Sequence, residues 1–471
     1  MAADDNQVAA PDTGFDEADP GYDLRPPFDD RLAERAKLLT KRRGQWLLRL
    51  ALGAVGFATR TRMPPPHPSS GGERPQRILV VRVDLLGDVV LSLPAVRALA
   101  RAFPEAEIDL LVLKSTAGIL EGQPGIHRVL AYDPHIWRQP GSFLRVSHWL
   151  EATHVLRTIR AARYDLAVSI SGDMGSILTR LSGARRRFGY SREAYRFFLT
   201  DPLPGGRYLT RQHETEYVLA LARAAGGIAT GPDDARPRLA VTQAANTLVS
   251  TLLGEGRAGL RRSGPVVTLH GGARNGQAKR WPTGHFARLA ERLVEDFNAL
   301  VVLTGAGSEA QIARAIEERC RHPLLNLAGK TSLPELAALL SASDLVISGD
   351  SGPMHIACAV GTPVISLHGP TDPLLSGPTS TPADGIVLRR ELWCSPCYNA
   401  SATAECPFGN PVCMKTLTVD LVYSAAWDRL VMSGHSVLRR PESLLYPVSK
   451  GTHYAATVTT DFPPPTDSQS S

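Results

Sequence analysis

Short apolar runs alternate with longer amphipathic stretches along most of this chain. Runs rich in β-branched residues, typical of buried strands, occur at 78–83, 108–113, 128–132, 166–170, 266–270, 300–303, 324–327, 345–347 and 364–367. The stretches between them place apolar residues at helical spacing. Because buried strands that alternate with helices form parallel sheets covered on both faces, the pattern predicts an α/β fold whose last strand is 364–367.

Two repeating units of this kind fit the length of the chain. Its 471 residues are too many for one ordinary core and suit two domains with tails. We expect a first domain at 77–240, a helix with the hinge within 242–262, and a second domain at 262–430. Two parallel sheets joined in this way predict a cleft between the carboxyl ends of their strands.

The ends of the chain differ from these domains in charge. The net charge is +6, but residues 1–30 hold nine acidic residues and one Arg, whereas residues 31–62 hold nine Arg or Lys and one Glu. We expect 1–30 to be a disordered acidic tail, 31–62 a basic amphipathic helix, 63–76 a linker, and 431–471 the end of a terminal helix and a disordered tail. The helix at 31–62 suits either an anionic membrane surface or packing on its own domain.

No segment has the pattern of a leader or a membrane span. The start is acidic, and the longest apolar candidate, Trp46 to Ala58, is short and contains Arg49. We therefore expect a cytoplasmic protein with reduced thiols. Binding of lipid by 31–62 would give it a peripheral position at the inner face of the cell membrane. We expect no nucleic-acid partner.

Residues 345–359 hold the first candidate for chemistry. A short strand runs into Ser-Gly-Asp-Ser-Gly and then into a helix. Asp350 or Ser351 suits the N-cap, and Gly349 and Gly352 would let a phosphate approach the backbone. A helix N-terminus that follows a strand favours anions, because free N–H groups and the helix dipole point outward together. An ordinary joint between strand and helix is the alternative.

Glycine turns and isolated charges follow other strands of the second domain. Gly271 and Gly272 lead to Lys279, a cation that suits a diphosphate, although a basic surface loop would have the same sequence. Gly305 begins a Gly-x-Gly turn that lacks the later acid of a dinucleotide site. We interpret it as a turn near a nucleotide, with Glu309 as a ribose ligand.

Asp88 follows the first strand of the chain. It ends the sequence Asp-Leu-Leu-Gly-Asp that begins at Asp84. A carboxylate at the carboxyl edge of a sheet, facing a cleft, can accept a proton from a hydroxyl nucleophile. The alternative role is the N-cap of the helix that follows.

Three of these stretches together resemble the glycosyltransferase family 9 heptosyltransferases, which build the inner core of lipopolysaccharide. They are Ile78-Leu-Val-Val-Arg-Val-Asp-Leu-Leu-Gly-Asp88, Lys279-Arg-Trp-Pro282 and Gly349-Asp-Ser-Gly-Pro-Met-His355. The resemblance implies the GT-B fold, two Rossmann-like domains facing across a cleft, with the donor nucleotide mostly on the C-terminal one. It also implies an ADP-activated heptose, inversion at the anomeric carbon, and no metal or other cofactor for catalysis.

The resemblance assigns roles to single residues. It makes Asp88 the general base and Lys279 a phosphate ligand. Thr331 would meet adenine through its backbone, and Glu309 would bind the ribose. The residues that would hold the donor pyrophosphate and sugar are Asp350, Ser351, Gly352 and His355.

Departures from the family pattern leave the sugar and the acceptor open. The tails and the basic helix are additions, and Asp84 follows Arg82 where the family often has small residues. The acceptor would be a lipopolysaccharide-core or other glycan hydroxyl, on the N-terminal domain. A GT-B enzyme with another nucleotide sugar and a non-catalytic, membrane-associated protein with this fold are the alternatives.

Four cysteines near the end of the second domain form a separate signal. The segment 394–413 contains Cys394, Cys397, Cys406 and Cys413. C-x2-C followed by two more cysteines is typical of a structural metal or cluster site. A disulfide and free thiols are the alternatives.

Other polar side chains support weaker predictions. His270, His285 and His368 lie near the expected cleft, and we interpret each as a hydrogen-bonded structural residue. The run Arg185–Arg187 suits either a solvated face or an anionic acceptor.

Overall fold

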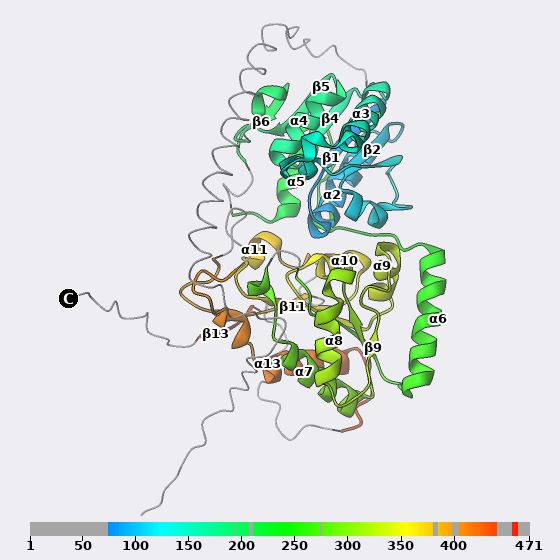
Figure 1. The fold of residues 1–471 in the computed structure, drawn as a ribbon, viewed down its shortest axis with the longest axis vertical. Helices are drawn as coiled ribbons and strands as arrows, with labels where there is room; N and C mark the ends of the chain where they lie inside the picture. Colours follow the sequence, from blue (N-terminus) through cyan, green and yellow to red (C-terminus); the bar gives the residue numbers. More distant parts are fainter. Residues whose placement is uncertain are drawn as a thin grey trace, which may run out of the picture.

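The computed structural model describes residues 74–193, 195–206, 211–273, 276–379, 385–397, 405–439 and 455–459. The expected acidic tail at 1–30 and basic helix at 31–62 lie outside these residues, as does most of the linker at 63–76. The described chain forms two α/β domains, drawn one above the other in Figure 1.

The first domain is built on a six-stranded parallel sheet with the order β3-β2-β1-β4-β5-β6. Its strands are β1 (Arg77–Arg82), β2 (Glu107–Val112), β3 (Arg128–Ala131), β4 (Leu166–Ser169), β5 (Arg186–Tyr190) and β6 (Asp201–Leu203). Its helices and 3-10 turns are α2 (Leu86–Ala102), η1 (Lys114–Leu120), η2 (Pro134–Arg138), η3 (Ser142–Leu144), α3 (Val146–Ala161), α4 (Gly172–Ser182), η4 (Arg196–Phe198), α5 (Glu214–Ala224) and η5 (Pro232–Ala235). The central strands β1 and β4 are almost wholly buried, because helices cover both faces of the sheet.

The second domain follows α6 (Gln243–Leu260) and has a seven-stranded parallel sheet with the order β13-β12-β11-β10-β7-β8-β9. Its strands are β7 (Val266–His270), β8 (Leu300–Thr304), β9 (Leu325–Asn326), β10 (Leu345–Gly349), β11 (Val364–His368), β12 (Gly385–Glu391) and β13 (Ala455–Thr459). Its helices and 3-10 turns are η6 (Gln277–Lys279), α7 (Thr283–Phe297), η7 (Gly307–Glu309), α8 (Ala310–Arg319), α9 (Leu333–Ser341), α10 (Gly352–Val360), α11 (Pro373–Ser376), α12 (Val412–Lys415) and α13 (Val419–Met432).

The sequence pattern misses four strands. β12 and β13 follow the strand expected to be last, and β13 lies in a segment expected to be disordered. β12 is only half-buried along most of its length, so its hydrophobic signal is weak. β5 contains the arginine run, whose charges hide an otherwise buried strand, and β6 has only three residues.

The two domains meet along α2 and α10. One apolar cluster contains Val89 and Leu93 of α2 together with Met354 and Ile356 of α10. In Figure 1, α2 and α5 lie at the lower edge of the first domain and face α10 and α9 of the second. The carboxyl ends of β1 and β10, which lead into these two helices, are therefore brought together by a shared apolar cluster.

Candidate active site

The β1 wall, which we define as residues 82–88, 170–171 and Glu214, lies where the strand order of the first sheet reverses. β1 pairs with β2 on one side and with β4 on the other. The loops after two such strands open the crevice in which α/β sheets bind ligands. The hydroxyl of Ser171, after β4, donates to Asp84 Oδ2, after β1, at 2.7 Å. This hydrogen bond joins the two loops.

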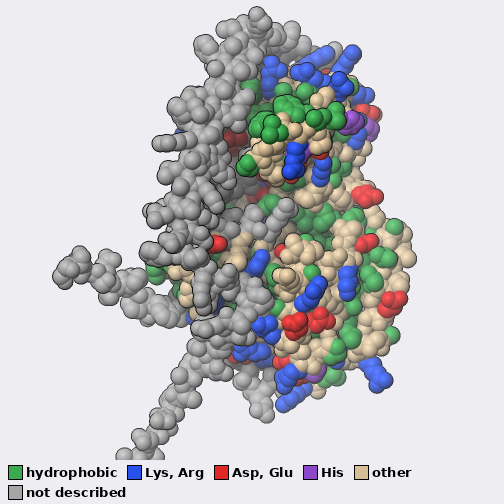
Figure 2. All heavy atoms as spheres, viewed as in Figure 1, with side chains coloured by type: hydrophobic (Ala, Val, Ile, Leu, Met, Phe, Trp, Pro, Cys, Tyr) green, Lys and Arg blue, Asp and Glu red, His purple; other side chains and the backbone are tan. Residues whose placement is uncertain are grey.

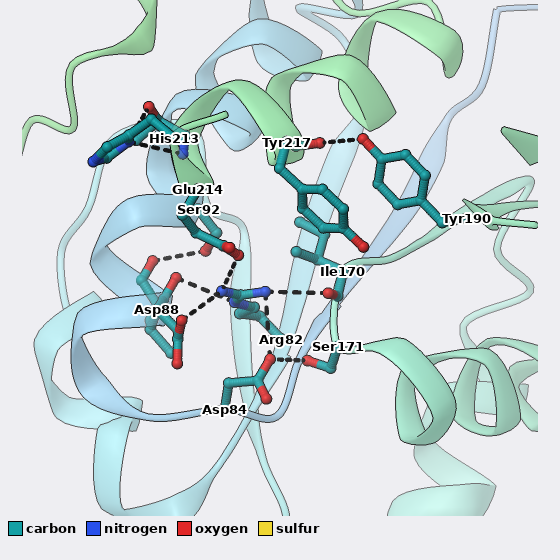
Figure 3. Close-up of polar contacts among 12 residues, drawn as sticks. Arg82, Asp84, Asp88, Ser92, Ile170, Ser171, Tyr190, His213, Glu214 and Tyr217 are labelled. Carbon is teal, nitrogen blue, oxygen red and sulfur yellow. Dashed lines mark hydrogen bonds and ion pairs between the residues drawn. The ribbon is translucent and has the colours of Figure 1, made fainter. Parts of the chain in front are cut away.

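Arg82, the last residue of β1, organises this wall (Figure 3). Its guanidinium is fully buried, and Nη2 lies 2.8 Å from Glu214 Oε1 and 3.1 Å from Asp88 Oδ1. Nη1 donates to the carbonyl of Ile170 at 3.1 Å and lies 3.4 Å from Asp84 Oδ2. A buried cation is unfavourable unless it is paired, so three carboxylates surround Arg82 and are held in place by it.

The three carboxylates differ in their access to solvent. The side chains of Asp84 and Asp88 are 24% and 25% exposed, whereas that of Glu214 is only 7% exposed. Glu214 therefore neutralises Arg82 from the protein interior, and the two aspartates are open to a substrate. Asp88 is not the N-cap of α2, because that position belongs to Leu85.

The β10 wall consists of the carboxyl ends of β7, β8, β9 and β10 and the residues that follow them. Ser351 is the N-cap of α10, but its hydroxyl shares a 2.9 Å hydrogen bond with Ser348 and does not cap a backbone N–H. The start of α10 thus keeps the character of an anion site.

Lys279 and Asp350 form an ion pair in this wall. Lys279 Nζ lies 3.0 Å from Asp350 Oδ2, and the two side chains are 13% and 8% exposed. Burial disfavours the ionised carboxylate, but the charge of Lys279, together with the charges that His368 and His355 carry in acid, outweighs it and lowers the pKa of Asp350. A diphosphate that entered here would compete with Asp350 for the same ammonium group.

Two buried histidines flank this ion pair. Burial lowers the pKa of His355 and of His368 to about 4, although Asp350 opposes the shift at both. Both imidazoles are therefore neutral near pH 7. His355 Nδ1 has no hydrogen-bond partner among the described residues, so this polar atom remains available to a ligand.

Glycine shapes the rest of the β10 wall. A Cβ at Gly272 would overlap the carboxylate of Glu309, so the turn after β7 lies directly against the turn after β8. Gly329, with φ of +74°, donates its N–H to the carbonyl of Gly305 at 2.8 Å and brings the loop that contains Thr331 to the same edge. Gly271 is similarly close to α8, because its Cβ would lie 3.0 Å from a methyl group of Ile316.

The two walls touch each other. A Cβ at Gly87 would lie 2.6 Å from the imidazole of His355, and one at Gly352 would lie 3.0 Å from Leu86. The charge of Asp88 is also one of those that act on the His355 ring. Asp88 and the start of α10, 264 positions apart in the chain, therefore lie next to each other at the junction of the two domains.

Several polar residues in these walls were not singled out from sequence. Glu214 and Ser171 lie far along the chain from Arg82 and Asp84, and no local pattern pairs them. A second bridge between the domains is formed by Arg211, which is 2.6 Å from Asp372, and by His213, whose Nε2 donates to the carbonyl of Gly377 at 3.1 Å.

Other predicted polar residues have structural contacts. His270 and His368 are buried and bond the carbonyl of Thr304 and the hydroxyl of Thr371, respectively. His285 stacks edge-on against Trp281.

The arginine run is not a free basic surface. Arg187 is buried, and its guanidinium donates to two backbone carbonyls. Burial lowers the pKa of Arg187 to about 10. Arg185 and Arg186 are exposed, as expected for a solvated face, and they pair with Asp165 and Asp201, respectively.

The cysteine-rich segment forms its own pocket beside the β10 wall. This largely apolar pocket is lined by Cys394, Cys397, Cys406 and Cys413 together with Ala278, the neighbour of Lys279. These four cysteines are not joined by disulfide bonds. Over the described residues, no three Cys, His, Asp or Glu side chains are placed to hold a metal ion. The four cysteines are thus gathered, and the metal site remains a prediction.

Comparison with known proteins identifies the family of these motifs. The chain matches glycosyltransferase family 9 (heptosyltransferase) over residues 152–407, more than half of its length. It is 28% identical over 318 residues to lipooligosaccharide heptosyltransferase 2 of Haemophilus influenzae, covering 66% of this chain and 88% of the relative. It is also 28% identical over 342 residues to lipopolysaccharide heptosyltransferase 1 of Pseudomonas aeruginosa, covering 70% and 88%.

Solved structures show the same fold. The family 9 glycosyltransferase from Veillonella parvula superposes with a TM-score of 0.63 at 23% identity, over 76% of this chain and 97% of that one. The ADP-heptose lipopolysaccharide heptosyltransferase II of Escherichia coli gives 0.59 at 22% identity, over 76% and 99%. The expected GT-B fold is therefore confirmed, and the chain belongs to glycosyltransferase family 9, the heptosyltransferase family.

Proposed function

We propose that this glycosyltransferase moves heptose from ADP-heptose to a hydroxyl of the lipopolysaccharide core and inverts the anomeric carbon. The donor and acceptor classes follow the names of its relatives, which are lipopolysaccharide and lipooligosaccharide heptosyltransferases. The observation that supports the reaction is the contact between the turn of Asp88 and the start of α10. A base and an anion site then face each other across one crevice.

Asp88 is the proposed general base. It is the carboxylate in the turn that contacts His355, whereas Asp84 is bonded to Ser171. Asp88 would take the proton of the acceptor hydroxyl as its oxygen forms a bond to the anomeric carbon. The bond from that carbon to the phosphate oxygen breaks in the same step, and Arg82 fixes the direction in which the carboxylate points.

The β10 wall would receive the leaving diphosphate. Negative charge grows on the phosphate oxygens as the bond breaks, and preorganised donors at that place lower the barrier. Lys279 and the N-terminus of α10 at Ser351 and Gly352 are such donors. In this proposal they meet the charge of the departing ADP without a catalytic metal.

The nucleotide would lie along the glycine turns of the same wall. Glu309, whose carboxylate lies against Gly272, would bind the ribose hydroxyls. Thr331, on the loop that is hydrogen-bonded to Gly305, would meet the adenine. His355 Nδ1, which has no hydrogen-bond partner among the described residues, would bond a hydroxyl of the donor sugar or a phosphate oxygen.

A product analysis tests this proposal. The protein is incubated with ADP-heptose, other ADP-sugars and UDP-sugars, each with a heptose-deficient lipopolysaccharide core, and the products are identified by mass spectrometry. We expect a mass increase of one heptose with ADP-heptose alone. Transfer from another nucleotide sugar in preference to ADP-heptose would replace the proposed donor, and no transfer from any donor would refute the function.

A further inference from the structure

Large apolar side chains gather on one exposed part of the first domain. Of fourteen exposed large hydrophobic residues in the described chain, five fall within eight positions of η3 and α3. They are Phe143 (60% exposed), Leu144 (87%), Val146 (69%), Trp149 (50%) and Leu150 (66%). We call them the 143–150 patch. Figure 2 shows a contiguous hydrophobic patch on the first domain, with Lys and Arg side chains nearby.

The 143–150 patch is not needed to build the core. α3 packs on the first sheet through a different set of residues, which includes Val155, Leu156 and Ile159. One face of α3 is thus already buried on the sheet. Leaving a second group of large apolar side chains in water costs free energy, and such a patch is typical of a binding surface.

The 143–150 patch is also held in a fixed shape. Trp149 Nε1 donates to the carbonyl of Phe143 at 2.9 Å. The ring of Trp137 lies 4.8 Å from that of Trp149 and 5.3 Å from that of Phe143, measured between centroids. Rigid aromatic side chains lose little entropy when they bind, so this surface is preorganised for a partner.

The chemistry of the surrounding residues points to lipid. Arg145, Arg157 and Arg160 are exposed in the same segment, whereas its single acid, Glu151, is paired with Lys114 at 2.6 Å. Tryptophan, other large apolar residues and exposed arginines in one place are typical of surfaces that lie at an anionic membrane interface. No helix in the described part of the chain is long and apolar enough to cross a bilayer.

The position of the patch links it to the reaction. η2 and η3 follow β3 at the carboxyl edge of the first sheet, the edge that also bears Asp84 and Asp88. His135 of η2 bonds the carbonyl of Val83 through Nε2 at 3.2 Å, so this segment is attached directly to the β1 wall. A surface held here would be close to the acceptor side of the crevice.

We propose that the 143–150 patch binds the anionic lipid surface in which a lipid-anchored acceptor is held. Its apolar side chains enter the interface, and its arginines contact lipid phosphates. The proposal rests on the proposed function, because it takes the acceptor to be lipopolysaccharide. A second copy of this chain is the competing occupant.

Vesicle binding by the full chain tests the proposal. Leu144→Glu/Leu150→Glu places charge in the patch, and the matched control Met432→Glu/Leu438→Glu alters two residues on the second domain that are 76% and 68% exposed. Partitioning onto phosphatidylglycerol–phosphatidylethanolamine vesicles is measured by sedimentation. We expect it to weaken roughly tenfold for the patch variant and to stay unchanged for the control.

Hydrogen exchange separates the patch from any lipid binding by residues 31–62. With vesicles, we expect slower amide exchange at 142–150 in the unaltered chain and in the control variant, but not in the patch variant. Equal exchange at 142–150 with and without vesicles would overturn the proposal. So would equal loss of partitioning in both variants, or a change of oligomeric state in the patch variant with vesicle binding intact.

Activity distinguishes this proposal from the proposed function. The patch variant should transfer heptose to a water-soluble, deacylated core oligosaccharide at the unaltered rate, but more slowly to acceptor embedded in vesicles. Equal rates on embedded acceptor for the patch and control variants would contradict the role of the patch. Absence of transfer to both acceptors by the unaltered chain would refute the proposed function and leave the vesicle result to stand alone.

Discussion

The β1 wall and the β10 wall both lie at the carboxyl edge of a parallel sheet, but they hold different arrangements of polar groups. In the β1 wall one buried cation, Arg82, holds three carboxylates within 3.4 Å or less. In the β10 wall glycines let turns approach closely, and Lys279, Asp350 and two neutral histidines share a small polar cluster. The first arrangement fixes a charged group, and the second leaves space for an anion. We infer that proton removal belongs to one wall and the leaving group to the other.

The comparison predicts its largest effect for Asp88→Asn. The amide cannot accept the proton, so turnover should fall about 1000-fold, within the usual range for loss of a general base. The affinity for ADP should remain nearly unaltered, because ADP binds to the other wall. Steady-state rates and calorimetry measure the two effects.

Asp84→Asn is the matched control, because Asp84 has the same exposure and the same partner in Arg82. Its effect on turnover should be far smaller. If Asp84→Asn loses as much activity as Asp88→Asn, the two carboxylates act together, and the assignment of Asp88 as the base fails.

Arg82→Met should lower the free energy of unfolding by about 3–5 kcal/mol, because it leaves a buried glutamate and two neighbouring aspartates without their counter-ion. Urea unfolding measures the loss. Arg82→Lys keeps the charge but not the fork that reaches several partners, and should lose less. An unfolding midpoint equal to that of the unaltered chain would mean that Arg82 does not organise the wall.

Acid should destabilise the β10 wall in particular. The pKa of His355 and of His368 is about 4 in the folded chain, against about 6.5 when unfolded, so between these values the unfolded chain binds more protons. The free energy of unfolding is therefore not reduced by these rings above pH 7. As the pH drops towards 4, it falls by on the order of 3 kcal/mol for each ring. Denaturant unfolding at pH 7.5, 6 and 5 measures the slope.

His368→Gln removes one of these titrating groups and should make the dependence on pH shallower, whatever its effect at pH 7.5. If the slope between pH 7.5 and 5 is unaltered in this variant, His368 does not titrate as its burial implies.

Lys279→Ala should weaken ADP binding by about tenfold to a hundredfold, equivalent to about 1.4–2.8 kcal/mol. The variant removes the ammonium group proposed to meet the diphosphate, and it leaves the β1 wall untouched. Calorimetry with ADP measures the affinity, with Lys279→Arg as the variant that keeps the charge. Undiminished affinity in Lys279→Ala would remove this residue from the phosphate site.

Gly272→Ala should have the smallest effect, a loss of roughly fivefold in ADP affinity. The added methyl group would displace the carboxylate of Glu309 from its place against the turn. Gly284→Ala is the matched control, because nothing lies within 4 Å of a Cβ at that position. Equal affinities in the two variants would exclude the proposed contact between Glu309 and the ribose.

The sequence predicts the β10 wall better than the β1 wall, for a physical reason. Asp350, Gly272, Glu309 and Thr331 each follow a strand or its turn, and parallel strands bring their carboxyl ends to one edge. The pattern of strands therefore predicts that these residues gather. Asp88 is placed in the same way. The exact contacts, such as Glu309 against Gly272, depend on the geometry of turns and could not be read from spacing.

The contacts of Arg82 could not be predicted, although the need for them could. A charged residue at the end of an apolar strand requires counter-charges when it is buried. Asp84 and Asp88 are near in sequence, but Glu214 lies 132 residues away. The same limit applies to β13, whose pairing with β12 joins segments of weak hydrophobic pattern. The local sequence pattern predicts helices and strands. A polar contact between residues far apart in the sequence can be identified only from the three-dimensional fold.

The stereochemistry of the product tests the two-wall account most directly. If the acceptor hydroxyl attacks from the β1 wall while the diphosphate leaves on the β10 wall, the new bond forms opposite the one that breaks. Nuclear magnetic resonance of the isolated product should then show the anomeric configuration of the transferred sugar inverted relative to the donor. Retention of configuration would contradict a single displacement across the crevice and the role of Asp88 as its base.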